Sequence, residues 1–137
     1  MGYVAWLGKY GSVLPNTHQC EDGCTLVRKD GGNVCMNYDF DRGKPFGIPV
    51  IVNSVGITRN YSDYWDRLFG KHIFDFLHGI RAEASIPLLA WAISQLSDDG
   101  LGDKDGWAAT DGNVKRCLTQ MLTLAEVCPD EVWSISE

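Results

Sequence analysis

The sequence predicts an α+β domain in which an N-terminal β-hairpin or small antiparallel sheet packs against a C-terminal pair of amphipathic helices. In the second half, residues 82–97 and 111–127 carry apolar side chains at the i, i+3, i+4 and i+7 spacing of such helices. The first half is rich in turn residues that separate short apolar runs, as is typical of strands. At 137 residues, the chain is long enough for a single domain with a buried core.

The strands expected in the first half are short. Residues 3–7 form the first strand, and residues 24–39 form a β-hairpin, because two adjacent glycines supply the positive φ angles that a tight turn requires. Residues 48–52 are an apolar run that Pro49 restricts to a sheet edge or to the start of a strand.

A short helix is expected over residues 63–69, with Ser62 as its N-cap and Gly70 as its end. A brief apolar segment, residues 73–77, follows it and ends at Gly79. These pieces connect the β-rich half to the two long helices.

The two long helices have apolar stripes and clear boundaries. The first ends at the Asp98-Asp99-Gly100 stretch, and the second begins at a cap provided by Thr110 or Asp111 and ends at Pro129. Residues 132–135 then return as a strand. The stripe of the first helix is Ile86, Leu89, Ile93 and Leu96, widened by Leu88 and Ala92; that of the second is Val114, Cys117, Leu118, Met121, Leu122 and Ala125.

Composition and charge exclude several classes of protein. The formal net charge of −6 disfavours direct binding to nucleic acid or to an anionic membrane, since both require a basic face. No apolar run approaches the roughly 20 residues of a membrane-spanning helix, and the first residues lack the features of a signal peptide. Five cysteines, an odd number, fit a reducing compartment better than a disulfide framework. We therefore expect a cytoplasmic protein.

One imidazole and three thiols make a candidate zinc site, formed by His18, Cys20, Cys24 and Cys35. The hairpin would return the last cysteine beside the third ligand. The spacing is irregular, however, because the usual two-residue gap between the first two thiols is missing. Small cysteines, buried or half-buried beside a turn, are the favoured interpretation, so no cofactor is expected.

Two other chemistries find little support. A thiol–imidazole pair between one of these cysteines and His18, His72 or His78 would lack any recognised protease signature. The acidic stretch from residue 98 to 106 does not match the EF-hand pattern of a calcium-binding loop, whether the loop begins at Asp99 or at Asp103. A solvated loop between helices is the better interpretation of that stretch.

Aromatic side chains, an arginine and hydroxyl groups gather in residues 57–65, at the entry to a helix. Such a segment forms an interaction surface or a ligand pocket, because Tyr, Trp and Arg dominate binding hot spots. The alternative is a capping loop whose aromatic side chains fill the junction between sheet and helices. We expect side chains projecting outward, and the candidate binding residues are Arg59, Tyr61, Tyr64, Trp65, Trp107 and Asn113.

Several motifs in residues 48–136 resemble small uncharacterised proteins of phages and prophages. The resemblance is carried by the turn Thr58-Arg-Asn60-Tyr-Ser62, the helix around Ala84-x-Ile86-Pro-Leu-Leu89, the motif Trp107-x-x-Thr110-x-Gly112-Asn113, and Pro129-Asp130-x-Val132-Trp133. It implies a small accessory protein that acts inside a bacterial host by binding a host or defence protein. Residues 1–47, with the cysteine and histidine group, lie outside it.

These observations favour a protein that works by stoichiometric binding to a host protein or complex. One concrete version is an inhibitor of a nucleic-acid-targeting defence complex, of the anti-CRISPR kind, because acidic side chains can occupy sites meant for phosphate. The alternative is a small ligand-binding domain or enzyme that uses the Arg59–Trp65 loop. No motif decides whether the protein is an enzyme.

Overall fold

The computed structural model describes residues 2–10 and 53–137 in full, and between them only the backbone of five short strands. The main sheet has three antiparallel strands in the order β7 (Ser54–Thr58), β1 (Gly2–Leu7) and β8 (Trp133–Ser136). The helices are α1 (Ser62–Phe69), α2 (Ile73–Leu77), α3 (Ala82–Ser94) and α4 (Asp111–Val127). The α+β class is thereby confirmed.

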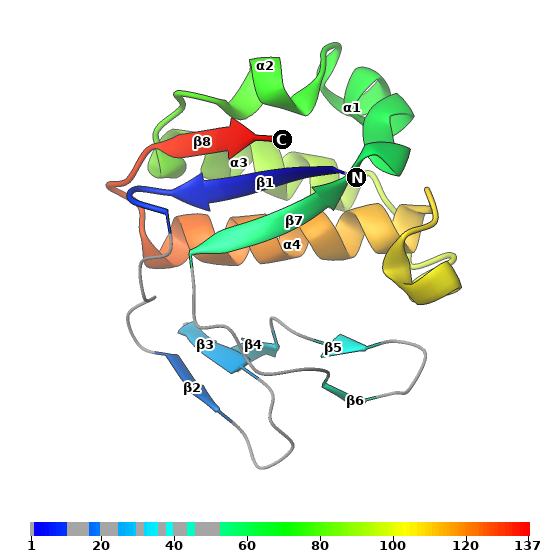
Figure 1. Ribbon diagram of the computed structural model, residues 1–137, viewed down its shortest axis with the longest axis horizontal. Helices are drawn as coiled ribbons and strands as arrows, with labels where there is room; N and C mark the ends of the chain where they lie inside the picture. Colours follow the sequence, from blue (N-terminus) through cyan, green and yellow to red (C-terminus); the bar gives the residue numbers. More distant parts are fainter. Residues whose placement is uncertain are drawn as a thin grey trace.

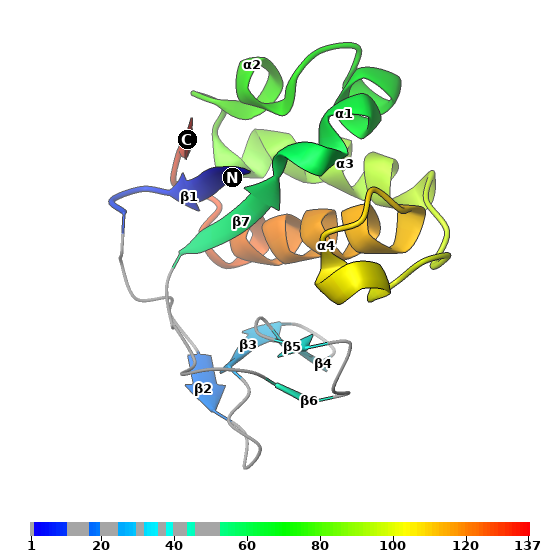
Figure 2. The same cartoon turned by 45° about the vertical axis from the view of Figure 1, so that its right-hand side comes forward.

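The sheet buries one face against the helices, and α3 and α4 form the layer behind it (Figure 1). Strand register places Val55, Ala5 and Ile135 in one row across the three strands, and all three are buried. Figure 2 shows α3 running beside α4, with α1 and α2 on the side of α3 away from α4. The predicted pair of packed helices is therefore present.

Helix α4 is the centre of the core, since ten of its seventeen residues are buried. Its bounds match the prediction, because the Thr110 hydroxyl caps the helix by accepting a hydrogen bond from the Asn113 amide, and Pro129 follows shortly after its end. Helix α3 ends at Ser94, three residues earlier than predicted. Its first free amide groups are satisfied from outside the helix, as Ala82 and Glu83 donate to carbonyls of Glu131 and Pro129.

The sheet that covers the helices is not the predicted N-terminal hairpin. Its strands come from the start, the middle and the end of the chain. The hairpin itself is present as β3 (Thr25–Lys29) paired antiparallel with β4 (Gly32–Cys35). It belongs to a second sheet with β2 (Thr17–Gln19), and β5 (Tyr38–Asp39) pairs with β6 (Lys44–Pro45). The strand expected at residues 48–52 lies outside the described residues.

The entry to α1 also differs from the prediction, because Ser62 is the first residue of the helix and not its cap. A 3₁₀ turn, η1 (Arg59–Tyr61), precedes the helix, and the hydroxyl of Thr58 caps that turn by accepting a hydrogen bond from the Asn60 amide. The predicted end is confirmed: Gly70 has a φ of 73°, the left-handed conformation that favours glycine. No helix of residues 53–137 is long and apolar enough to cross a bilayer.

Candidate functional site

Three of the four aromatic and basic residues predicted to project from the 57–65 segment are buried. Tyr61 and Tyr64 keep 2% and 9% of their surface, and Trp65 keeps none. The expectation that these side chains point outward is wrong, because the turn η1 places Tyr61 in the core and the amphipathic helix α1 does the same for Tyr64 and Trp65. The Trp65 ring contacts those of Tyr61 and Phe69. Side chains this buried hold the fold and cannot themselves touch a partner.

Arg59 is the one member of that group that stays on the surface. Its guanidinium pairs with the Glu137 carboxylate at 2.8 Å and lies over the ring of Tyr3, 5.4 Å from the ring centroid. These contacts join η1 to β1 and to the end of β8. An exposed ion pair of this kind adds little stability, about 0–1 kcal/mol, so Arg59 remains accessible to a partner.

The buried tyrosine has a second role, which is to hold the loop between α3 and α4. This 97–110 loop includes a short 3₁₀ turn, η2 (Asp103–Gly106). The Tyr61 hydroxyl donates to the carbonyl oxygen of Gly106 at 2.5 Å, and the Asn60 amide side chain donates to the carbonyl oxygen of Trp107 at 2.8 Å. The predicted site residues Tyr61 and Trp107 therefore lie close together, but the contact runs through the backbone of the loop.

Asn113, the last predicted binding residue, is fully buried and ties the same loop to α4. Its Oδ1 accepts a hydrogen bond from the Gly102 amide at 2.7 Å. Its Nδ2 donates to the carbonyl oxygens of Asp103 and Ala108 at 3.0 and 3.1 Å. One amide side chain thus fixes three points of the loop. Asn113 is therefore a structural support of the loop, and because it is buried it cannot contact a binding partner directly.

The start of α4 approaches the loop so closely that only glycine fits at position 112. The Gly112 amide donates to the carbonyl oxygen of Asp99 at 2.8 Å. A Cβ atom on Gly112 would lie 2.5 Å from the Leu101 nitrogen and 2.7 Å from the Asp98 oxygen, both of them backbone atoms. The Thr110 hydroxyl adds a further tie by donating to the carbonyl oxygen of Gly100 at 2.9 Å.

The tip of the loop is strained. Lys104 and Asp105 have φ angles of 47° and 61°, and they are the only residues other than glycine with positive φ in the described part of the chain. The left-handed conformation costs a residue with a side chain roughly 1–2 kcal/mol. Strain of this kind persists where surrounding contacts fix the backbone, and it concentrates at functional sites. The hydrogen bonds from Tyr61 and Asn113 are such contacts.

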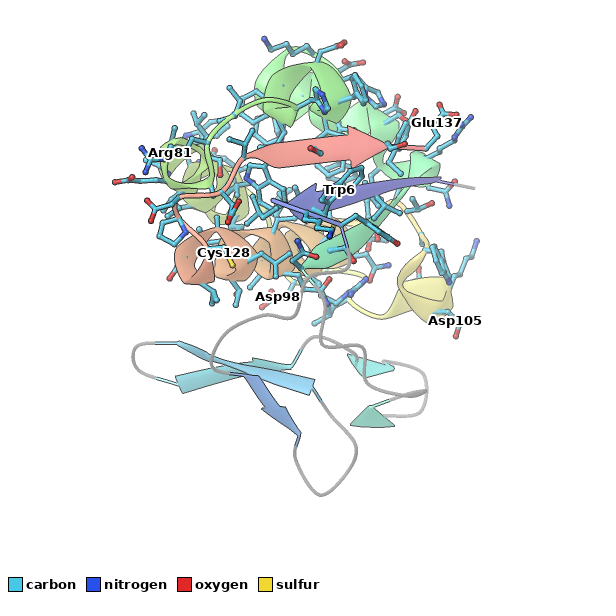
Figure 3. All side chains as sticks on the ribbon, turned by 60° about the vertical axis from the view of Figure 1, so that its left-hand side comes forward. Trp6, Arg81, Asp98, Asp105, Cys128 and Glu137 are labelled. Carbon is cyan, nitrogen blue, oxygen red and sulfur yellow. The ribbon has the colours of Figure 1, made fainter. Side chains whose placement is uncertain are left out.

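The loop displays apolar and acidic side chains together. Trp107 and Leu101 keep 60% and 46% of their surface. Asp99, Asp103 and Asp105 are exposed, and Figure 3 shows Asp105 at the outer end of the loop. Asp98, by contrast, pairs with Lys115 of α4 at 3.0 Å. Among the described residues, Asp103 and Asp105 make no ion pair, so their charges remain available.

Electrostatics at the base of the loop favour a fixed, protonated tyrosine. Burial, with the nearby Cys117 as a smaller cause, raises the pKa of Tyr61 to about 12, so its hydroxyl remains a hydrogen-bond donor. Tyr64 donates to the Asp111 carboxylate at 2.7 Å. That bond, followed by one from the Ser97 amide, lowers the pKa of Asp111. Together the two bonds link α1 and α4 to the start of the 97–110 loop.

The predicted zinc ligands stay a prediction. Cys20 and Cys24 lie outside the described residues, as do the side chains of His18 and Cys35. The backbone register places His18 of β2 and Cys35 of β4 opposite Leu26, on its two neighbouring strands. Within the fully described residues there is no group of three or more His, Cys, Asp or Glu side chains that could hold a metal ion.

Sequence reasoning treated residues 98–106 as a plain solvated loop and missed their link to Trp107. The available signal was the spacing of Gly100, Gly102 and Gly106, which lie among aspartates and next to an aromatic residue. In the structure all three glycines have positive φ. Comparison of the chain with protein-family models, with curated proteins and with solved structures finds no match. Function is therefore inferred from the geometry and charge of the loop.

Proposed function

We propose that this protein acts by stoichiometric binding to another protein, and that the 97–110 loop is its contact surface. The observation that carries the proposal is Trp107, which is 60% exposed on a loop whose backbone is tied at several points. Exposed tryptophans anchor interfaces, and a loop that is already ordered loses less conformational entropy on binding. Leu101 on the same loop adds a second apolar contact.

The charge of the loop favours a basic partner. Asp99, Asp103 and Asp105 are exposed on the same loop as these apolar residues, and the whole chain carries a formal charge of −6. Carboxylates of this kind complement surfaces that bind phosphate. The partner we propose is a bacterial nucleic-acid-targeting defence complex, inhibited in the cytoplasm by a phage-type accessory protein. Residues 48–136, on which the resemblance to phage proteins depends, include the entire loop.

The alternative, a small enzyme or ligand-binding domain around residues 59–65, has no specific observation in its favour. The Tyr61 side chain is buried, and its hydroxyl donates to the carbonyl of Gly106. Arg59 is paired with Glu137. The Tyr61 hydroxyl and the Arg59 guanidinium thus contact different parts of the protein and do not converge on one ligand site.

The test is capture of bacterial proteins from a nuclease-treated lysate, followed by affinity measurement on the purified partner. The wild-type chain should capture a nucleic-acid-binding complex, and nucleic acid should compete with it. Trp107→Ala should weaken binding by about 2 kcal/mol, or roughly 30-fold. Asp103→Asn with Asp105→Asn should weaken binding most at low salt, because exposed charges are screened as salt rises.

Trp91→Ala is the matched control, because Trp91 is a second exposed tryptophan, 49% exposed, on α3. At nanomolar protein concentration this variant should bind as the wild type does. Equal binding by wild type and the Trp107→Ala variant would overturn the proposed contact surface. A captured partner that has no affinity for nucleic acid would overturn the proposed class of partner.

A further inference from the structure

The outer face of α3 is apolar where a surface helix ordinarily carries charge. Leu88 and Trp91 keep 43% and 49% of their surface, and Ala84 and Pro87 beside them are also exposed. These four positions follow the i, i+3, i+4, i+7 spacing, so they form a single stripe along the helix. The opposite side of α3, with Ala82, Ser85, Leu89 and Ala92, is buried in the core. Helix α3 is thus apolar on both sides.

The stripe is also free of charge. From Ala84 to Ser97 the sequence has no charged residue, although the chain as a whole carries a formal charge of −6. Two acidic copies would therefore meet across this face with no charged side chain inside the contact, and they would repel each other only through their net charges at longer range. A basic partner would gain no electrostatic attraction here, unlike at the 97–110 loop.

We infer that this α3 stripe binds a second copy of the same chain. A two-fold axis across the stripe makes the two helices antiparallel, and each patch then contacts its own equivalent. The stripe is self-complementary in this arrangement, because its large side chain, Trp91, lies at one end and its smallest, Ala84, lies at the other. The Trp91 ring of one copy packs on Ala84 and Pro87 of the other, around a centre that holds both copies of Leu88.

The size of the stripe sets the strength of the contact. A 13-residue helix is about 20 Å long. Its exposed apolar side chains offer on the order of 400 Å² per copy, about half of the area that a partner contributes to a standard stable interface. The dimer is therefore weak, and it forms only at high protein concentration. This inference does not depend on the proposed function.

Sedimentation equilibrium of the full chain, from about 5 µM to about 1 mM, tests the inference. The weight-average mass should rise toward twice the chain mass of 15.2 kDa. The dissociation constant should fall as salt increases, because salt screens the repulsion between two acidic copies. Leu88→Gln and Trp91→Gln should each raise the constant at least 10-fold, and glutamine preserves the helix at these exposed positions.

Leu101→Gln is the matched control, since Leu101 is as exposed as Leu88 but lies on the other surface. It should dimerise as the wild type does, and circular dichroism should confirm that every variant is folded. A wild-type chain that stays monomeric at about 1 mM would overturn the inference, as would α3 variants that associate like the wild type. A monomeric chain whose binding to a purified partner is weakened by Trp91→Gln would assign the stripe to that partner, and would also overturn the dimer.

Discussion

Replacing Asn113 by alanine should loosen the 97–110 loop without unfolding the domain. The substitution removes the three hydrogen bonds that the side chain makes to Gly102, Asp103 and Ala108. At about 1 kcal/mol for each bond, the loss is about 3 kcal/mol. Lys104 and Asp105 together store roughly 2–4 kcal/mol of strain. About half of it, roughly 1–2 kcal/mol, is returned, because the Tyr61 hydroxyl still holds the carbonyl of Gly106 and the loop relaxes only in part. We therefore expect a net loss of about 1–2 kcal/mol in the free energy of unfolding.

Two measurements separate the loop from the whole domain. Urea denaturation followed by circular dichroism gives the global loss, and amide hydrogen exchange at Gly102 reports the loop, because this amide donates directly to Asn113. Asn60→Ala is the graded control, since it removes a single exposed bond to Trp107 and should cost under about 1 kcal/mol. Unchanged stability together with unchanged exchange at Gly102 in the Asn113→Ala variant would refute the role assigned to this side chain.

Three further predictions concern single positions. Gly112→Ala should destabilise the domain by about 1–3 kcal/mol, because the added Cβ would meet backbone atoms of Leu101 and Asp98, even though alanine ordinarily strengthens a helix. Gly56→Ala is the control: nothing lies near its Cβ, so it should be nearly neutral in the same thermal melt. Trp65→Ala should cost about 3–5 kcal/mol, whereas Trp107→Ala should change stability by less than about 0.5 kcal/mol; equal melting temperatures would contradict the burial of Trp65. The pKa of Asp111 is lowered in the folded state, so its ionised carboxylate stabilises the fold above about pH 4, and this stabilisation is lost as the pH falls through the folded pKa. The urea midpoints of wild type and Asp111→Asn should therefore converge in acid, and a difference that stays constant with pH would contradict this role of Asp111.

The helices could be predicted from sequence because their signals are local. The apolar period of α4, the cap at Thr110 and the stop at Pro129 all lie within a few residues of the element that they define. The main sheet could not be predicted in this way. Strand β1 pairs with β7 and with β8, from the middle and the end of the chain, and short strands carry no mark of the partner that they choose.

The sequence did not reveal that the aromatic side chains of the candidate site are buried, and this error has a physical cause. Asn60, Tyr61 and Asn113 do belong to one structure, the support of the 97–110 loop, as their hydrogen bonds to it show. Residue type alone did not reveal which side chains are exposed. A tyrosine hydroxyl can be satisfied by a backbone carbonyl inside the protein, as Tyr61 is, so an aromatic cluster suits a core as well as a surface. Likewise, the apolar residues of α3 fit more than one stripe, and Leu88, expected to widen the buried one, faces outward.

The strain and the supports of the loop are of similar size. Two left-handed residues cost roughly 2–4 kcal/mol, and the four side-chain hydrogen bonds from Tyr61 and Asn113 contribute about 4 kcal/mol. A loop without these bonds would relax, and Trp107 would sample many positions. Ordering Trp107 on binding would then cost conformational entropy, a cost that the folded protein avoids because its loop is already ordered. The hydrogen bonds of the buried Tyr61 and Asn113 side chains therefore keep the exposed Trp107 in place, because they hold the loop in a conformation that its own backbone does not favour.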